Sequence, residues 1–219
     1  MRYNLKKKIF LIDFDGTISL SDLALFTVEN YGGEDWEYYE KLFNENKLSL
    51  EDTITAQYSL IHAPKDVILQ EIDKVTEIRQ NFKQFIDYCQ YLTIPVIIVS
   101  GGIDFVIRHV LDRLGIPKTL QIVSMKVEYQ NDGSIKVTRP KRYTRNSVDF
   151  KQDLLRFYKS NNYSVYYIGD GSSDYGAVTD ADLTFSVKGS NLTNFCAEKN
   201  ISYKEFVDFD EIISYLKTF

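Results

Sequence analysis

The sequence predicts an α/β fold, a Rossmann-like parallel sheet with a small helical domain inserted after the first strand. Apolar runs over Ile9–Phe14, Ile94–Ser100 and Tyr163–Ile168 each lead into a loop of acids, hydroxyls and glycines. Continuous runs rich in β-branched residues are typical of strands covered on both faces, as in a parallel sheet. Helical stretches alternate with these strands, which favours right-handed crossovers. Residues 20–91, in contrast, show helical spacing and no strand pattern.

Each element of this fold has a local justification. A fourth strand is expected over Leu183–Val187, bounded by polar residues. Amphipathic spacing predicts helices over Ile103–Leu114, Ser147–Tyr158, Asn191–Lys199 and Asp210–Lys217. The turn residues Asn131-Asp132-Gly133 predict a hairpin within Val123–Val137.

The domain division follows from this pattern. Residues 1–19 and 92–219 form the predicted catalytic core, and residues 20–91 form the predicted helical cap. Breaks between cap helices are expected at Tyr31-Gly32-Gly33, Leu48-Ser49 and Ala63-Pro64. Ser49 followed by Asp52 is a helix start with an acid in its first turn.

Composition limits the classes of partner. The formal net charge of −5 disfavours non-specific nucleic-acid binding, which needs clustered Lys and Arg. The longest apolar runs are far shorter than a membrane span, so no membrane partner is expected. Two distant cysteines, Cys89 and Cys196, predict buried reduced thiols and a cytoplasmic protein. A homodimer is left open.

The polar loops carry the chemistry. Asp13, Asp15, Asp170 and Asp174 follow predicted strands directly, and Ser100 closes another. The carboxyl ends of parallel strands share one edge of a sheet, where ligands bind. Four carboxylates at one point repel each other, and a hard cation removes that penalty. Oxygen ligands in this number suit Mg²⁺, the predicted cofactor.

These loops resemble the haloacid dehalogenase-like (HAD) phosphohydrolase superfamily. DFDGT at Asp13–Thr17 is similar to its first motif, Ser100 to its second, and GDGSSD at Gly169–Asp174 to its fourth. Lys151, on the helix before the fourth-motif strand, resembles the third-motif lysine. The resemblance covers Lys8 to about Leu216. The insertion after the first motif resembles the C1-capped branch, which includes phosphoserine phosphatases and the MtnX-like group.

The resemblance implies a phosphatase acting on a small phosphorylated metabolite through a phospho-aspartyl intermediate. Asp13 is implied as the nucleophile and Asp15 as the general acid and base, roles that suit carboxylates. Ser100, the amide of Gly101 and Lys151 are implied to hold the transferring phosphate.

The resemblance also implies the remaining site residues. Thr17 is expected to steady the loop and the phosphate. Asp13, the backbone carbonyl of Asp15, and Asp170 are expected to hold Mg²⁺, while Asp174 either completes the metal shell or orients Lys151. The substrates of the branch are phosphoserine, a methionine-salvage enol phosphate, phosphocholine, phosphoethanolamine and pyridoxal phosphate.

The role of Asp22, the substrate and the choice of lysine each have an alternative interpretation. Asp22 is either a substrate contact or a helix N-cap. The sequence has no Arg between Gly16 and Ile78, which disfavours phosphoserine because Lys replaces a bidentate Arg poorly. Lys141 rivals Lys151 as the phosphate-stabilising lysine, and its basic stretch from Arg139 is expected to be a solvated surface loop.

Other functions are weighed against hydrolysis. A phosphotransferase would pass the phosphoryl group from Asp13 to an acceptor alcohol. A non-catalytic binding module would lack the nucleophile or the acid, and both are present. A calcium loop is disfavoured because Gly16 comes too early and Ala24 stands where the closing Glu belongs. A receiver domain is disfavoured because a serine, Ser100, ends the mid-sheet strand.

Overall fold

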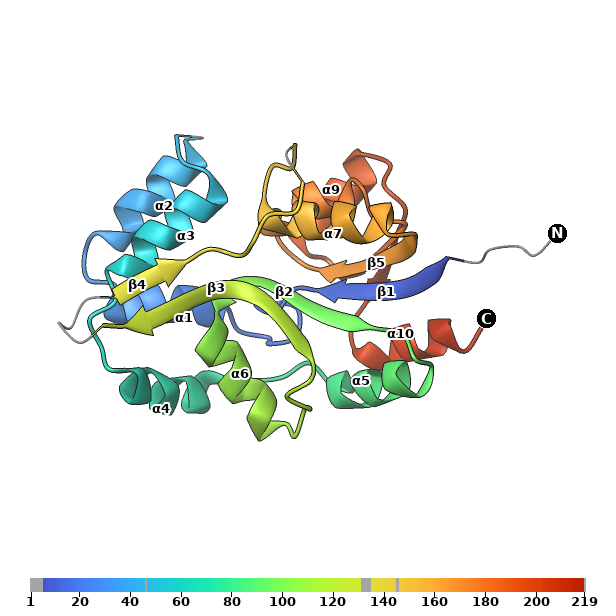
Figure 1. Cartoon of the computed structure of the whole chain (residues 1–219), viewed down its shortest axis with the longest axis horizontal. Coiled ribbons are helices and arrows are strands. Elements are labelled where there is room, and N and C mark those ends of the chain that lie inside the picture. The colour runs from blue at the N-terminus through green and yellow to red at the C-terminus, as the bar shows by residue number, and fades with distance from the viewer. Residues whose placement is uncertain (1–5, 46, 131–134, 145, 219) are drawn as a thin grey trace.

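The fold is a seven-stranded sheet flanked by helices, seen in a computed structural model that describes residues 6–45, 47–130, 135–144 and 146–218 (Figure 1). The strand order is β4-β3-β2-β1-β5-β6-β7. All neighbours pair in parallel except β3 and β4, which are antiparallel. The strands are β1 Lys7–Ile12, β2 Val96–Ile103, β3 Gln121–Tyr129, β4 Ile135–Thr138, β5 Tyr163–Gly169, β6 Leu183–Val187 and β7 Tyr203–Phe206. The predicted mostly parallel α/β fold is confirmed.

Helices cover both faces of this sheet. In Figure 1, α7 and α9 lie above the sheet, while α4, α6, α5 and α10 lie below it. Helices α2 and α3 pack on each other near β4, beside the carboxyl ends of the central strands. The helices are α1 Leu23–Tyr31, α2 Trp36–Asn44, α3 Leu50–Ser59, α4 Lys65–Val75, α5 Phe82–Tyr91, α6 Asp104–Arg113, α7 Phe150–Ser160, η1 Ser172–Asp174, α8 Tyr175–Val178, α9 Asn191–Glu198 and α10 Phe209–Leu216.

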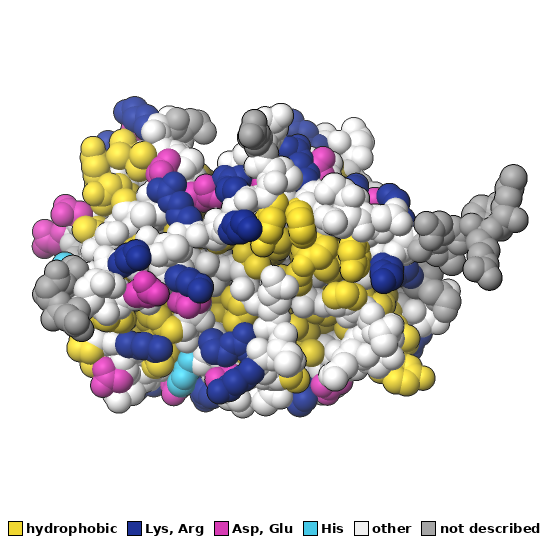
Figure 2. Space-filling model, viewed as in Figure 1, with side chains coloured by type: hydrophobic (Ala, Val, Ile, Leu, Met, Phe, Trp, Pro, Cys, Tyr) yellow, Lys and Arg dark blue, Asp and Glu magenta, His cyan; other side chains and the backbone are white. Residues whose placement is uncertain are grey.

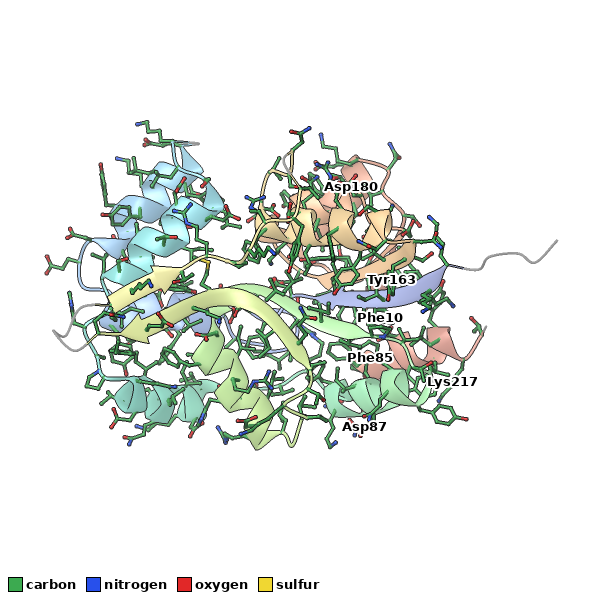
Figure 3. The ribbon with its side chains drawn as sticks, in the orientation of Figure 1. Phe10, Phe85, Asp87, Tyr163, Asp180 and Lys217 are labelled. Atoms are coloured by element: carbon green, nitrogen blue, oxygen red, sulfur yellow. The ribbon has the colours of Figure 1, made fainter. Side chains whose placement is uncertain are left out.

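Two apolar cores result from the two-residue period of β1. Ile9 and Leu11 belong to the core under α7, and Phe10 and Ile12 belong to the core on the opposite face. The Phe10 ring lies edge-on to Phe85 of α5, with the ring centroids 5.1 Å apart (Figure 3). Because both faces of β1 are buried, the loop after Ile12 is held at a fixed position above the sheet edge.

Most predicted elements are present within one or two residues. Helix α7 begins at Phe150, later than expected, because the Asp149 side chain accepts from the Gln152 amide and caps it there. Strand β2 continues through Ser100 to Ile103, with a register shift against β3 after Val99. Strand β7 was not predicted. The hairpin pairing of β3 with β4 is confirmed, whereas the turn residues 131–133 lie outside the described residues.

The helices of the predicted cap interval contact different parts of the predicted core. Helix α4 contacts α6, and α5 contacts α10 beneath the sheet. The boundary at residue 91 stays a prediction, but by its contacts α5 belongs to the layer that packs on β1. The helices that stand over the strand ends are α1, α2 and α3. All three predicted breaks between cap helices are confirmed.

Candidate active site

The loop after β1 places two carboxylates at the sheet edge. The Asp13 amide donates to the Ile168 carbonyl of β5 at 2.9 Å, which ties the loop to the neighbouring strand. The Asp15 carboxylate accepts from the amides of Leu23 and Ala24, at 2.8 and 3.3 Å, where α1 begins. Asp15 is therefore oriented by the first turn of the cap helix α1.

Lys151 reaches this loop from α7 through the protein interior. Its side chain is 1% exposed, and its Nζ lies 2.9 Å from Asp13 Oδ2 and 2.7 Å from Asp174 Oδ1. Burial favours the neutral amine, but the charges of Asp13 and Asp174 raise the pKa of Lys151. The rival lysine, Lys141, lies over the Tyr143 ring instead. The structure thus brings Lys151 to the carboxylates as predicted.

Asp174 is fully buried and orients its neighbours. Its Oδ1 accepts from Lys151 and from the Tyr167 hydroxyl at 2.7 Å. Its Oδ2 accepts from the amides of Asp170 and Gly171 at 3.0 and 3.1 Å. Both oxygens are engaged within the protein, so of the two expected roles the geometry favours orientation of Lys151 and the fourth-motif loop.

The remaining acids fit a divalent cation. Asp13, Asp170 and Asp174 each offer an oxygen within 4.8 Å of the others. Burial first, and then the Asp174 charge, raise the pKa of Asp13 and raise that of Asp170 to about 6. The Lys151 charge offsets part of this shift, and a hard cation with oxygen ligands would relieve the rest. Since Asp174 is already saturated, the fitting ligands are Asp13 and Asp170.

Thr17 and Ser100 have distinct positions. Thr17 is buried, and its hydroxyl donates to Asp170 Oδ1 at 2.9 Å. The Thr17 hydroxyl therefore binds Asp170, one of the two acids that fit a metal ion, rather than facing the cavity. Ser100 lines the cavity; its Oγ accepts from the Gly102 amide at 2.9 Å and lies 3.4 Å from Asp15 Oδ2.

A cavity of about 270 Å³ opens between these residues and the cap. Its cap side is lined by the polar residues Asp22, Glu40 and Gln57, and by apolar side chains of α1, α2 and α3. The Gln57 amide nitrogen lies 3.2 Å from Glu40 Oε2. Asp22 caps α1 by accepting from the Leu25 amide at 2.8 Å. Asp22 is thus both an N-cap and a cavity residue, so its two expected roles do not exclude each other.

The pKa of Asp15 is shifted toward neutrality. Burial first, and then the charge of Asp22, raise the pKa of Asp15 to about 7. A carboxyl group with such a pKa exchanges a proton readily at neutral pH. The expected acid and base thus has the electrostatic environment that the role requires.

Several site residues carried no sequence signal. Arg79 donates to the backbone carbonyls of Gly16 and Thr17, at 2.8 and 2.7 Å, and so holds the loop that follows β1. The Tyr58 hydroxyl of α3 donates to the Gly101 carbonyl at 2.9 Å. An arginine binding a backbone carbonyl has no fixed spacing, so only the folded structure shows these contacts.

The basic stretch lies in an irregular segment at the surface, as expected, with Arg139 exposed and Arg142 half-buried. Arg142 Nη2 lies 2.8 Å from Glu51 of α3, and Arg139 Nη2 lies 2.7 Å from Asp52. The prediction did not include these two ion pairs, which form because the chain between β4 and α7 passes along α3. They join the catalytic core to the cap.

The sequence pattern of the haloacid dehalogenase-like hydrolases matches residues 10–179. The chain belongs to this family. Its residues at the strand ends correspond to the motifs that predicted the family, and the expected enzyme class, a hydrolase, is confirmed. None of the helices in the described part of this hydrolase is both long and apolar enough to cross a membrane.

Similar proteins cover almost the whole hydrolase. A 2-hydroxy-3-keto-5-methylthiopentenyl-1-phosphate phosphatase of Lysinibacillus sphaericus is 28% identical, over 94% of this chain and 92% of that protein. A polyol phosphate phosphatase of Saccharomyces cerevisiae is 27% identical, over 96% of this chain and 93% of that protein. A substrate-bound phosphoserine phosphatase structure has a TM-score of 0.69 at 20% identity, over 96% of this chain and 98% of that one. This last likeness shows the shared fold.

Proposed function

We propose that this hydrolase is a magnesium-dependent phosphatase that cleaves a small phosphomonoester through a phospho-aspartyl intermediate on Asp13. One observation carries the proposal. Lys151 bridges Asp13 and Asp174 in the protein interior, and Asp15, whose pKa is raised to about 7, lies on the same loop as Asp13. A buried cation beside a carboxylate nucleophile suits an anionic phosphoryl group. The free, buried Cys89 and Cys196 support a cytoplasmic location.

The chain's own residues account for the proton and phosphoryl transfers. An Asp13 oxygen attacks phosphorus, the bond from phosphorus to the alcohol oxygen breaks, and Asp15 donates its proton to that oxygen. Asp15 then takes a proton from water as the water attacks phosphorus, which releases inorganic phosphate and regenerates Asp13. Lys151, Ser100 and the amide of Gly101 bind the phosphate oxygens.

The metal has a defined place in this scheme. Asp13 and Asp170, with the backbone carbonyl of Asp15, would hold Mg²⁺, and Thr17 would position Asp170. The bound ion would neutralise charge on the phosphate oxygens. Asp174 positions Lys151 and the loop rather than contacting the substrate.

We further propose that the alcohol part of the substrate carries no negative charge. Among the described residues that line the cavity, Lys151 is the basic one, against five carboxylates: Asp13, Asp15, Asp22, Glu40 and Asp170. Lys151 is already paired with Asp13 and Asp174, so no unpaired basic side chain remains among these described lining residues for a second anionic group. The substrate names of the two sequence relatives, a polyol phosphate and a keto-enol phosphate, contain no carboxylate either.

The mechanism is tested by phosphate release from a panel of small esters, with and without Mg²⁺. Asp13→Asn should abolish the magnesium-dependent release, because the amide is not a nucleophile. Asp87→Asn on the exposed face of α5 is the control for loss of one charge. If Asp13→Asn keeps wild-type activity, the nucleophile is wrong. Phosphate appearing on an added alcohol instead of in solution would establish a phosphotransferase.

The substrate class is tested within the same panel. Glycerol phosphate and phosphoethanolamine should have higher kcat/KM than phosphoserine. Phosphoserine is the matched comparison because it differs from phosphoethanolamine by one added carboxylate. Glu40→Gln should reduce the difference, because one repelling charge is removed from the cavity. A preference for phosphoserine would contradict the proposed class without affecting the mechanism.

A further inference from the structure

A second cavity, of about 510 Å³, lies between α4, α6 and β3. It shares no residue with the active-site cavity. From α4 come Lys65 and Leu69, which are four residues apart and so lie on one side of the helix. The alternate residues Ile122, Ser124 and Lys126 of β3 lie on one face of the strand and line the floor. The α6 face consists of Asp104, Phe105, Arg108, His109 and Asp112. The cavity is therefore built from ordered elements rather than loops.

Cations surround this cavity without ion-pair partners. No salt bridge within the described ranges involves Lys65, Arg108 or Lys126. Arg108 Nη2 donates to the Leu120 carbonyl at 2.9 Å. Its Nη1 is buried and has no hydrogen-bond partner among the described residues. A buried guanidinium nitrogen without an acceptor is unusual, since such groups are generally satisfied.

The cavity floor has a second unsatisfied group. Ser124 is 7% exposed, lies on β3 between Ile122 and Lys126 on the same face, and its hydroxyl has no partner in the described part of the chain. An anion accepts from both a hydroxyl and a guanidinium. Two described residues that each have a buried polar atom without a hydrogen-bond partner, Arg108 and Ser124, thus line the same cavity.

The negative charges at this cavity are partly engaged. The Asp104 carboxylate accepts from the Val127 amide at 3.4 Å. His109 Nε2 lies 2.7 Å from Asp73, outside the cavity. Asp112 is exposed at the rim. Lys65, Arg108 and Lys126 carry three positive charges at the cavity, against the two carboxylates of Asp104 and Asp112, so the net charge is positive. Lys and Arg side chains are visible over α4 and α6 in Figure 2.

We propose that this cavity binds a small organic anion, a phosphate or carboxylate group joined to a short apolar portion. The anionic group would accept from Arg108, Ser124 and the lysines. The apolar portion would pack on Leu69 and Phe105, whose ring already lies 4.9 Å from Lys65 Nζ. Helix α6 begins directly after β2, the strand that carries Ser100, so the site borders the catalytic strand. This binding is separate from the phosphatase reaction.

The test is a titration of ¹⁵N-labelled, magnesium-loaded enzyme with phenylphosphonate, benzoate and benzyl alcohol, followed by NMR. Saturable shifts of the Arg108, Ser124 and Lys126 amides with either anion are expected, and the stronger probe identifies the preferred anionic group. Shifts at Ser100 and Gly171 would report active-site binding separately. No saturable shift at the three cavity amides, or equal affinity for benzyl alcohol, would overturn the proposal.

Charge reversal provides the matched comparison. The double variant Lys65→Glu, Lys126→Glu should weaken anion affinity about tenfold or more, because two exposed charge contacts are reversed. Lys199→Glu, an exposed lysine after α9, should leave affinity unchanged. Equal affinity in the double variant and in Lys199→Glu would refute the site. Should the double variant unfold, Lys65→Gln and Lys126→Gln singly take its place.

Discussion

Gly102→Ala should displace Asp15, the proposed general acid, without changing any of the proposed catalytic groups. A Cβ at Gly102 would lie 2.8 Å from Asp15 Oδ2 and 3.2 Å from Ser100 Oγ. Ordinary contact begins at 3.4 Å, so the Asp15 oxygen must move by the difference, 0.6 Å. Because a misplacement of roughly 1 Å can cost about 100-fold in rate, we expect kcat to fall on the order of tenfold.

Gly101→Ala is the natural comparison for this variant. Its Cβ would point to the opposite side of the strand, 3.0 Å from the terminal methyl group of Ile54 on α3. That side chain can rotate, so we expect a change mainly in KM. The assay is steady-state kinetics on the best substrate, with circular dichroism to confirm folding. If Gly102→Ala is folded and keeps wild-type kcat, then Asp15 does not act from the position described.

Three further predictions concern pH, metal and the cap. Because the pKa of Asp15 is raised to about 7, the proton donation to the leaving alcohol should slow as pH rises through that value. Asp22→Asn removes a neighbouring negative charge, so the alkaline limb of the pH profile of kcat/KM should shift to lower pH. An unmoved limb would contradict the effect of Asp22 on Asp15. In metal-free protein, the pKa of Asp170 is raised from 3.8 to about 6. Its stabilising contribution is present below the lower value and lost as pH rises through the higher one, so Tm should fall over this range. The fall should be smaller in Asp170→Asn, where only the raised pKa values of the other acids, such as Asp13 and Asp15, still contribute. Glu51→Gln should lower the free energy of unfolding by about 1.5–3 kcal/mol, since the buried carboxylate accepts from an arginine. Asp52→Asn, which breaks the more exposed ion pair with Arg139, should lower the free energy of unfolding by less than about 1 kcal/mol. Chemical denaturation measures both variants, and equal losses would contradict the expected effect of burial.

Much of the fold was predictable because burial on both faces leaves a strong pattern. Strands β1, β2 and β5 were found from their apolar runs, and their parallel order brings Asp13, Ser100 and Asp170 to the same edge of the sheet. Strand β7, with the sequence YKEF, was not found because it is an edge strand, and half of its residues are exposed. The position of α5 beneath the sheet was also missed, since helical spacing identifies an apolar face but not its partner.

The site was predictable to a similar degree. Placement of Lys151 beside Asp13 and Asp174 agrees with the prediction, although its catalytic role stays a proposal. The hydroxyl of Thr17 bonds to Asp170, which its motif position did not specify. Arg79 was not predicted at all.

By itself, the sequence determined the family, the order of the elements and the acids at the strand ends, because these depend on local patterns and on short motifs. Only the tertiary structure decided which oxygens are already engaged. Asp174 is saturated by Lys151, Tyr167 and two amides, and the described residues that line the cavity above Asp13 include five acids but no unpaired basic side chain. Such contacts join residues far apart in the chain, and their energies depend on burial and distance, which no local pattern encodes.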